Sequence, residues 1–85
     1  MKKVSAIIVN WNGKDILSKC IQSLLKQEYE NLEIWVSDNG SEDGSQAMLK
    51  ELYPSVHLVE NGENLGFGTA VNRALGKAQG DYLLF

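Results

Sequence analysis

The sequence has little of several features that would place it in a specialised class of protein. Its 85 residues include one cysteine and one proline, and they carry a net charge of −3 with no run of basic residues. A single cysteine excludes an internal disulfide framework and is typical of a reducing compartment. The single proline argues against a disordered linker, and an acidic chain without a basic run is a poor match for a nucleic-acid surface. We therefore expect one small globular domain that does not bind nucleic acid.

Long hydrophobic runs are also missing from the sequence. The start, Met1-Lys2-Lys3 followed by Val4 to Val9, is similar to the start of a signal peptide, but its apolar stretch ends at Asn10 after six residues. Six residues are too few for the hydrophobic region of a signal peptide or for a membrane span. We expect a cytoplasmic protein, either free or peripheral to the inner face of the cell membrane.

What the sequence does contain is an alternation of apolar segments and helical patterns. Strands are expected at residues 4–9, 32–36, 56–60 and 81–85, where β-branched and aromatic residues gather. Helices are expected at residues 13–27, 44–53 and 69–79. The alternation predicts a three-layer α/β/α domain with a mainly parallel sheet of strand order 3-2-1-4. In that order the first two helices cover one face of the sheet and the third helix covers the other.

The helical patterns also predict how each helix begins and which side chains it buries. Asn12 and Asp43 are the expected N-caps, and Gln46 is the expected capping-box partner of Asp43. The side chains expected on the inner faces of the three helices are Ile16, Leu17, Cys20, Ile21, Leu24 and Leu25, then Ala47, Met48, Leu49 and Leu52, then Ala70, Val71, Ala74, Leu75 and Ala78. Cys20 in such a stripe indicates core packing rather than a nucleophile. His57 stands alone, which favours a structural role over metal ligation.

Three predicted strand-to-helix loops should meet at one edge of the sheet, because the carboxyl ends of parallel strands lie together. These loops are residues 10–13, 38–44 and 61–68. They supply the aromatic face of Trp11, the carboxylate of Asp38 and a glycine-rich backbone before a helix. An aromatic face can stack on a base, a carboxylate can accept the N3–H of uracil or thymine, and backbone N–H groups at a helix start suit phosphate. The sequence therefore predicts a nucleotide site, with the alternative that Asp38 only caps its own turn left open.

Common nucleotide and hydrolase motifs do not occur in the sequence. A dinucleotide fingerprint would need Gly-x-Gly-x-x-Gly after the first strand, where the chain has Asn-Trp-Asn-Gly. The pairs Gly13-Lys14 and Gly76-Lys77 lack the Ser or Thr that a P-loop requires. No Gly-x-Ser-x-Gly elbow is present.

Three stretches of the sequence carry a resemblance to a known family. They read VSAIIVNWNGKDILSKCIQSLLKQ from Val4, LEIWVSDNGSEDGS from Leu32, and ENLGFGTAVNRALGKAQGDYLLF from Glu63. Together they resemble the N-terminal part of family 2 glycosyltransferases of the GT-A fold, and most closely the rhamnosyltransferase-like branch of bacterial cell-surface polysaccharide synthesis. The resemblance implies the donor-binding portion of an enzyme that transfers a sugar, with inversion, from a UDP- or dTDP-sugar to a polysaccharide or glycan acceptor.

The resemblance also implies which residues bind the nucleotide-sugar. Carried over by position, this set is Val9, Asn10, Trp11, Asp38, Asn64, Gly66, Gly68, Asn72 and Arg73. Val9 and Trp11 would flank the nucleoside, and Asp38 would accept a hydrogen bond from the base imide. The loop from Asn64 to Gly68 would lie beside the nucleotide, in front of Asn72 and Arg73 on the following helix. The alternative in which Arg73 pairs with a surface carboxylate stays open.

The metal site implied by the resemblance falls outside the chain. Family members hold Mg²⁺ or Mn²⁺ with an Asp-x-Asp motif after the strand that begins at Tyr82, and the sequence given ends at Phe85, where that motif would begin. Carboxylate ligands of such a metal cannot be replaced by an acid at the end of another strand. We therefore expect residues 1–85 to be a partial domain with no catalytic residue, no metal ligand and no transferase activity by itself.

Two other interpretations remain open. The apolar strand from Tyr82 would lie at an open edge of the sheet, where unpaired backbone groups favour self-association or pairing with another chain. The chain would then be a non-catalytic interaction module. A nucleotidyltransferase of similar architecture is the other alternative, but it would need a glycine-rich loop with a basic residue after the first strand, which residues 10–12 do not supply.

Overall fold

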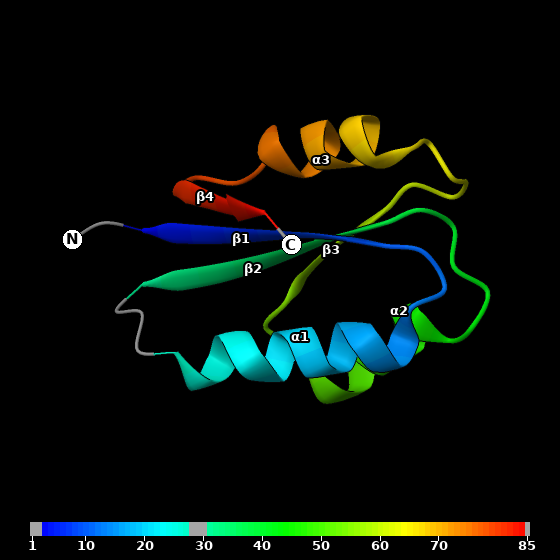
Figure 1. Cartoon of the computed structure of the whole chain (residues 1–85), viewed down its shortest axis with the longest axis horizontal. Helices are drawn as coiled ribbons and strands as arrows, with labels where there is room; N and C mark the ends of the chain where they lie inside the picture. The colour runs from blue at the N-terminus through cyan, green and yellow to red at the C-terminus, as the bar shows by residue number, and fades with distance from the viewer. Residues whose placement is uncertain (1–2, 28–30, 85) are drawn as a thin grey trace.

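A computed structural model describes residues 3–27 and 31–84 of the chain. Its elements are β1 (Val4–Asn10), α1 (Lys14–Lys26), β2 (Leu32–Asp38), α2 (Ser45–Leu52), β3 (His57–Glu60), α3 (Phe67–Leu75) and β4 (Asp81–Leu84). The alternation of strands and helices confirms the predicted α/β class (Figure 1). The charged start at Met1-Lys2 and the expected end of the last strand at Phe85 lie outside the described residues.

The four strands form one parallel sheet in the order β3-β2-β1-β4. β1 lies inside the sheet, paired with β2 from Val4 opposite Leu32 to Asn10 opposite Asp38. On its other side, β1 pairs with β4. The register of β2 with β3 places Asp38 opposite Glu60. The last residues of β1, β2 and β3 therefore lie side by side at one edge of the sheet.

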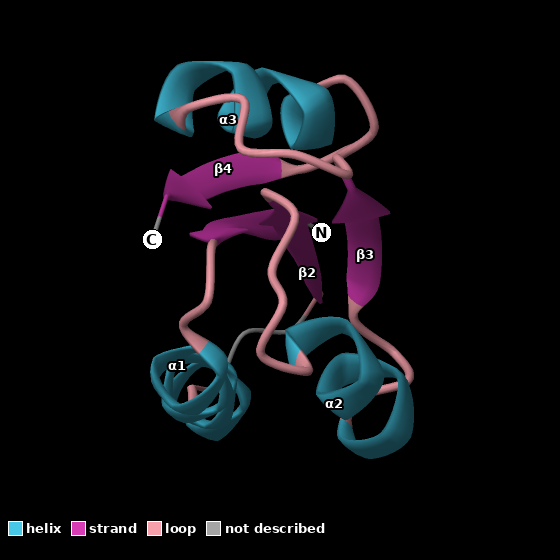
Figure 2. Cartoon of the chain, turned by 90° about the vertical axis from the view of Figure 1, so that its right-hand side faces the viewer, coloured by secondary structure: helices cyan, strands magenta, loops and turns pink. Residues whose placement is uncertain are grey.

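The helices form the two outer layers of the fold. Figures 1 and 2 show α1 and α2 on one face of the sheet and α3 on the other. The larger core cluster lies under α1 and α2 and consists of Ala6, Ile8, Leu17, Ile21, Leu24, Ile34, Val36, Met48 and Leu49. Successive side chains of a strand point to opposite faces, so Ile7 belongs to the α3 side, where Ala70, Val71 and Ala74 are also buried. Each fully buried Leu, Ile or Val contributes about 1.5–3 kcal/mol to folding.

The buried stripe of each helix is narrower than the sequence predicts. On α1, Leu17, Ile21 and Leu24 are buried, whereas Ile16 is 76% exposed and Leu25 is 56% exposed. On α2, Leu52 is 63% exposed. A helix that lies flat on a sheet buries about one third of its circumference, so residues at the borders of the stripe turn toward solvent.

The predicted N-caps of α1 and α2 were wrong. The residues before these helices are Gly13 and Gly44, and neither cap makes a side-chain hydrogen bond. Asn12 Oδ1 accepts the N–H of Glu42, and Asp43 Oδ2 accepts the N–H of Lys14 at the start of α1, while Asp43 Oδ1 also accepts the N–H of Ser45, the first residue of α2. Asn and Asp oxygens can accept from local or from distant donors, and here each of the two accepts a distant one.

The end of α3 also differs from the prediction. The helix ends at Leu75, well before the expected stop at Gly80. Gly80 has another role, because a Cβ there would lie 2.5 Å from the carbonyl oxygen of Lys3. The glycine lets the chain pass close to the start of β1 before it enters β4.

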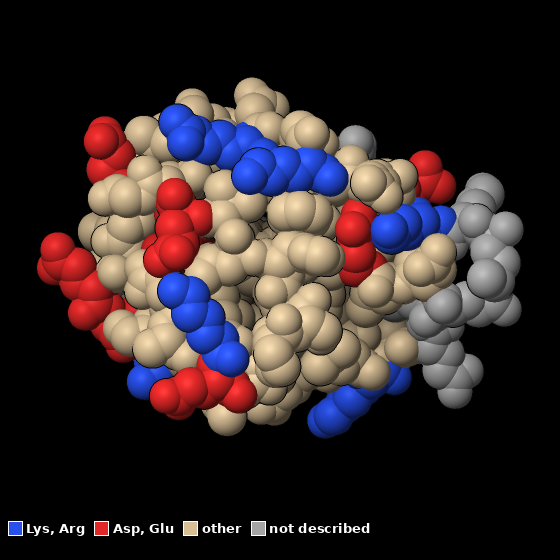
Figure 3. Space-filling view, turned by 180° about the vertical axis from the view of Figure 1, so that it is seen from behind, with Lys and Arg blue, Asp and Glu red and all other residues tan. Residues whose placement is uncertain are grey.

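Figure 3 shows acidic and basic side chains interspersed over one face rather than gathered in a patch of one sign. None of the helices in the described part of the chain is long and apolar enough to cross a membrane.

Candidate functional site

The carboxyl edge of the sheet brings three strand-to-helix loops together. They run from β1 to α1 (residues 11–13), from β2 to α2 (residues 39–44) and from β3 to α3 (residues 61–66). Figure 2 looks onto this edge. Hydrogen bonds between side chains at the strand ends join the three loops, and these contacts define the candidate site.

The carboxylate of Asp38 lies beneath this edge and is 1% exposed. Its Oδ1 accepts hydrogen bonds from Asn10 Nδ2 at 2.9 Å and Ser41 Oγ at 2.7 Å. Its Oδ2 accepts hydrogen bonds from the Ser41 N–H at 2.9 Å and from Gln46 Nε2 at 2.7 Å. A buried charge is tolerated when donors surround it in this way. Gln46, the expected capping-box partner of Asp43, is one of these donors instead.

The structure thus corrects the expected surroundings of Asp38. The sequence places the residue correctly at the end of β2, but its side chain is enclosed by protein donors rather than open to a ligand. Direct contact with a base would require one of the present donors to leave. That contact stays a prediction.

Trp11 is displayed at the same edge, with 58% of its surface exposed. The residues on both sides of it are fixed: Asn10 by Asp38, and Asn12 by the β2–α2 loop. Asn12 has a φ of 52°, a left-handed conformation that asparagine tolerates better than most residues. The Asn12 N–H donates to Ser41 Oγ at 2.8 Å, and Asn12 Oδ1 accepts the Glu42 N–H at 2.7 Å. An exposed indole on a fixed loop is a surface prepared for a flat ligand.

Asp43 adds a further connection between the first two loops. Its Oδ2 accepts the N–H of Lys14 at 2.9 Å, at the start of α1. The hydrogen bond from the Ser45 hydroxyl, together with those from the N–H groups of Lys14 and Ser45, holds the pKa of Asp43 below its usual value. Asp43 is therefore charged at neutral pH and acts as a charged acceptor between α1 and α2.

Asn39 connects the second loop to the third and is 3% exposed. Its Nδ2 donates to the carbonyl oxygen of Gly66 at 3.2 Å and to Asn64 Oδ1 at 3.4 Å. Its Oδ1 accepts a hydrogen bond from Asn61 Nδ2 at 2.9 Å. The Gly66 N–H also donates to Asn64 Oδ1 at 2.9 Å, so this loop is tied to itself as well as to Asn39.

The predicted site residues fall into two groups. Those joined by the hydrogen-bond network are Asn10, Asp38, Asn64 and Gly66. Those whose side chains take no part in it, among the hydrogen bonds of the described residues, are Val9, Trp11, Asn72 and Arg73, and Gly68 lies in the first turn of α3. Trp11, Asn64, Gly66, Gly68, Asn72 and Arg73 are exposed, and Val9 is half-buried.

Sequence reasoning missed four residues that build the edge. They are Asn39, Ser41, Gln46 and Asn61, and each donates or accepts a hydrogen bond that joins one element to another. A usable signal was present, because an asparagine stands at the end of β1 and directly after β2 and β3. A short amide side chain can donate and accept at once, which suits it to joining neighbouring strand ends.

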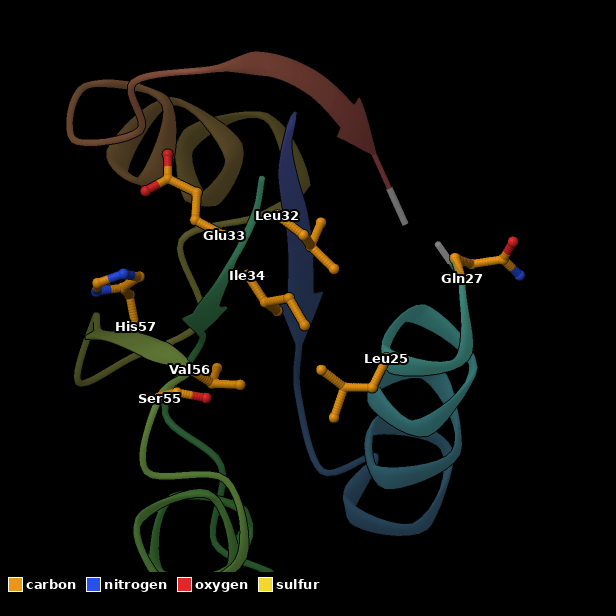
Figure 4. Close-up of a pocket in the computed structure, with 8 residues that line it drawn as sticks. All are labelled: Leu25, Gln27, Leu32, Glu33, Ile34, Ser55, Val56 and His57. Carbon is orange, nitrogen blue, oxygen red and sulfur yellow. The ribbon is translucent and has the colours of Figure 1, made fainter. Parts of the chain in front are cut away.

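Two of the hollows outlined by the described residues lie at opposite ends of the sheet. One, of about 560 Å³, lies beside the Trp11 loop and is lined by Asn12, Gly13, Lys14, Asp15, Ile16 and Asp43. The other, of about 360 Å³, lies at the opposite end of the sheet, where β2 and β3 begin. Figure 4 shows Leu25, Ile34 and Val56 facing that space, while Glu33 and His57 project from the other side of their strands. The first hollow belongs to the loop edge, and the second does not.

Within residues 3–27 and 31–84, no three His, Cys, Asp or Glu side chains come together in a group that would hold a metal ion. Asp38 and Asp43 each use their oxygens on protein donors.

A parallel α/β sheet with its polar loops gathered at the carboxyl edge defines a class of protein that binds its ligand at that edge. Within that class, the sequence matches the family described as Glycosyl transferase family 2 over residues 5–85. The chain belongs to this family.

Two relatives show how much of a longer protein the chain covers. Glycosyltransferase GlyA of Streptococcus pneumoniae serotype 4 is 35% identical over 85 residues, which are 98% of this chain and 12% of that protein. The N-acetylglucosaminyl-diphospho-decaprenol L-rhamnosyltransferase of Mycobacterium tuberculosis is 36% identical over 78 residues, which are 88% of this chain and 25% of that protein. The chain spans a quarter or less of the length of these relatives.

Two solved structures share the fold. The mannosyltransferase PcManGT from Pyrobaculum calidifontis, in complex with GDP-Man and Mn²⁺, superposes with a TM-score of 0.83 and 29% identity over 93% of this chain and 25% of that one. TarS 1-349 of S. aureus gives a TM-score of 0.86 and 25% identity over 98% of this chain and 26% of that one. These likenesses confirm the fold class and the family resemblance predicted from the sequence.

Proposed function

We propose that this chain is the donor-nucleotide-binding portion of a glycosyltransferase that moves a sugar from a nucleotide-diphospho-sugar to a glycan acceptor. The observation that carries the proposal is the indole of Trp11, which is 58% exposed on a loop fixed at both of its neighbours. The family match and the likeness to a mannosyltransferase bound to GDP-Man support it.

The residues at the edge suit the parts of such a ligand. The base stacks on Trp11 beside Val9, and the diphosphate lies toward the start of α3, where Gly66 and Gly68 are exposed and the first N–H groups of a helix suit phosphate. The exposed Arg73 and Asn72 of α3 stand on the same element as this helix start and offer a positive charge and an amide to the phosphates or the sugar. The family resemblance in the sequence points to a pyrimidine base, so the donor in this proposal is a UDP- or dTDP-sugar.

The remaining parts of the proposed reaction need residues outside this chain. The acceptor is a cell-surface polysaccharide or glycan, and transfer proceeds with inversion. We expect Mg²⁺ or Mn²⁺ to neutralise the leaving diphosphate, with ligands that follow Phe85 in a longer protein. In this proposal residues 1–85 form a partial domain that binds the nucleotide and does not transfer the sugar alone.

The test is a calorimetric titration of the chain with UDP, dTDP and GDP. Trp11→Ala should weaken binding of UDP or dTDP, because stacking of a base on an aromatic ring contributes about 1–3 kcal/mol. Trp11→Tyr should keep most of the affinity, since it retains a flat ring. Trp35→Phe is the matched control, because it removes the other tryptophan, which stacks on His57 at a centroid distance of 4.3 Å and not at the loop edge.

Two results would reject this function. One is the absence of measurable binding of all three nucleotides to the wild-type chain. The other is equal affinity of wild type and Trp11→Ala for the nucleotide that binds best. Preference for GDP would keep the general function and overturn the pyrimidine assignment.

A second function is favoured by the edges of the sheet. Among the described strands, β4 pairs only with β1, so its other edge offers backbone groups to a further strand. A non-catalytic module that pairs through this edge would self-associate or bind another chain. Sedimentation over a range of concentrations, together with thermal unfolding with and without UDP, separates the two functions, because the module predicts association and no shift of Tm by nucleotide.

A further inference from the structure

Asp38 is a buried acidic residue, and protein donors occupy both of its carboxylate oxygens. The observed arrangement therefore leaves no room for a ligand to contact this carboxylate. We propose that Asp38 is a positioning residue, which holds Trp11 in its exposed orientation by fixing the residues before and after it. The inference rests on the proposed function, because it assigns how the nucleotide-stacking surface is built.

The first step of the argument is the connection from Asp38 to both neighbours of Trp11. Asn10 Nδ2 donates directly to Asp38 Oδ1 at 2.9 Å. On the other side, the Asn12 N–H donates to Ser41 Oγ at 2.8 Å, and that hydroxyl donates to the same Asp38 Oδ1 at 2.7 Å. One carboxylate oxygen therefore fixes the chain immediately before Trp11 directly, and the chain immediately after it through a single hydroxyl.

The second step is that every donor and acceptor of the Ser41 hydroxyl in this connection is already in use. Ser41 Oγ donates one hydrogen bond and accepts two, from Asn10 Nδ2 and the Asn12 N–H, which is all a hydroxyl can make. Asn10 is 5% exposed and Ser41 is 8% exposed, so water cannot easily replace a lost partner. Removing the carboxylate would leave several buried donors without an acceptor.

The third step is that Asp38 is itself held by the rigid part of the fold. It is the last residue of β2, and its Oδ2 accepts a hydrogen bond from Gln46 in the first turn of α2. Asp38 thereby fixes the position of the Trp11 loop relative to both the sheet and α2. Asn12 depends on this support, because it keeps a positive φ of 52° only while the loop partners hold it.

The test exchanges the two side chains of the central hydrogen bond. Asp38→Asn alone places an amide NH₂ against donors that need an acceptor. The double variant Asn10→Asp with Asp38→Asn restores the pairing with reversed polarity. In it, the amide introduced at position 38 would donate to the new carboxylate at position 10, while the amide oxygen accepts from the Ser41 N–H and Gln46. Ser41 Oγ could then donate to the carboxylate at position 10 and still accept the Asn12 N–H. The exchange leaves net charge and composition unchanged.

Two readouts are measured for each variant, all in a Trp35→Phe background so that Trp11 is the only indole. Acrylamide quenching and fluorescence anisotropy report the mobility of Trp11 without any nucleotide. Titration with UDP and dTDP reports binding. Asp38→Asn should raise Trp11 mobility and weaken binding by about tenfold or more, and the exchange should restore both to near the wild-type values. Glu51→Gln, which removes the same charge from an exposed position of α2, should change neither.

Each outcome decides the proposal. A folded Asp38→Asn variant with unchanged Trp11 mobility and unchanged affinity overturns it. A folded exchange variant that restores Trp11 rigidity but not binding overturns the claim that Asp38 acts on binding only by positioning Trp11. If neither variant folds, Ser41→Ala decides, because it removes the hydroxyl that connects Asp38 to Asn12 and leaves the direct hydrogen bond from Asn10 to Asp38 in place. Unchanged Trp11 quenching in that variant rejects the proposal. If the wild-type chain binds no nucleotide, the proposed function fails while the mobility of Trp11 still tests the positioning role.

Discussion

Single residues at the strand ends determine how closely the loops approach one another. Gly40 shows this most directly, since its φ is +77° and a Cβ there would lie 2.9 Å from the Cα of Glu63. The second and third loops therefore touch backbone to backbone at this point. Gly62 has a similar φ of +79°, but no atom lies within 4 Å of its added Cβ. A substitution at Gly62 would therefore cost only the free energy of the left-handed backbone conformation, whereas one at Gly40 would add the free energy of a steric clash.

Gly40→Ala should destabilise the chain more than Gly62→Ala does. Both substitutions impose a left-handed conformation on alanine, at a cost of about 1–2 kcal/mol, but only the first also pushes Glu63 away. Urea unfolding followed by circular dichroism measures both free energies. Equal losses of stability in the two variants would show that the two loops are not in contact at Gly40.

The residue scale is also where prediction from sequence was least complete. The position of Asp38 at a strand end follows from local pattern, but its burial does not, because Asn10 lies 28 residues away in the sequence. The same holds for Asn12, whose side chain accepts a donor 30 residues away rather than capping its own helix. A local pattern gives the capacity of a side chain to make hydrogen bonds, and only the fold decides which partner is nearest.

Among the elements, α1 and α2 form the outer layer next to the first two loops, and Tyr53 connects them. Its hydroxyl shares a hydrogen bond of 3.0 Å with Ser18 Oγ and accepts one of 3.1 Å from Gln22 Nε2, both on α1. Tyr53 directly follows α2 as its C-cap, and its ring packs against the main core. The ring contributes packing, and the hydroxyl contributes the connection between the helices.

Tyr53→Phe should destabilise the chain only slightly, lowering the folding equilibrium constant by no more than about fivefold, because its hydrogen bonds are partly open to water. Combined with Gln22→Ala in a double-mutant cycle, it should show a small but measurable coupling between the two side chains. The free energies come from urea denaturation of the four proteins. Strict additivity of the two substitutions would contradict a hydrogen bond between these side chains in solution.

Element boundaries were predicted only approximately for a related reason. Hydrophobic spacing located all three helices, but it did not show that Ile16 would be 76% exposed or that α3 would end at Leu75. The width of a buried stripe depends on the curvature of the surface beneath it. A helix end depends on where the next strand must begin.

Across the whole molecule, a second polar cluster closes the end of the sheet opposite the loops. Glu33, at the start of β2, accepts hydrogen bonds from the Ser5 hydroxyl and, at 2.8 Å, from the Gln79 N–H. Lys3 Nζ lies 3.6 Å from its other oxygen, and the Gly80 N–H donates to Ser5 Oγ at 2.8 Å. The cluster therefore joins the starts of β1 and β2 to the segment that leads into β4.

Acid should weaken this closure. Burial raises the pKa of Glu33, but the hydrogen bonds from Gln79 and Ser5 and the charge of Lys3 outweigh burial and lower the pKa from 4.5 to about 2. Because the pKa of Glu33 is lower in the folded state than in the unfolded state, ionised Glu33 stabilises the fold. This stabilisation is fully present above about pH 4.5 and is lost as the pH falls toward 2. Glu33→Gln should be less stable than wild type at neutral pH by on the order of 2 kcal/mol, and the difference should shrink through that acid range.

The measurement is the urea midpoint at a series of pH values. Glu60→Gln is the matched control, because Glu60 pairs with Lys50 at 3.7 Å on the surface and its side chain is 52% exposed. Such a surface pair contributes less than about 1 kcal/mol. A stability difference between Glu33→Gln and wild type that does not depend on pH would contradict the lowered pKa of Glu33.

The sequence by itself determined the α/β class, the family and the edge at which the polar loops gather. These properties follow from hydrophobic periodicity and from motifs that are continuous in the chain. Only the tertiary structure decided that Asp38 is enclosed while Trp11 is exposed, and that Glu33 closes the opposite end with a donor 46 residues away. The physical reason is that burial and hydrogen-bond partnership depend on which distant groups arrive beside a side chain, and neighbouring residues in the sequence do not specify that.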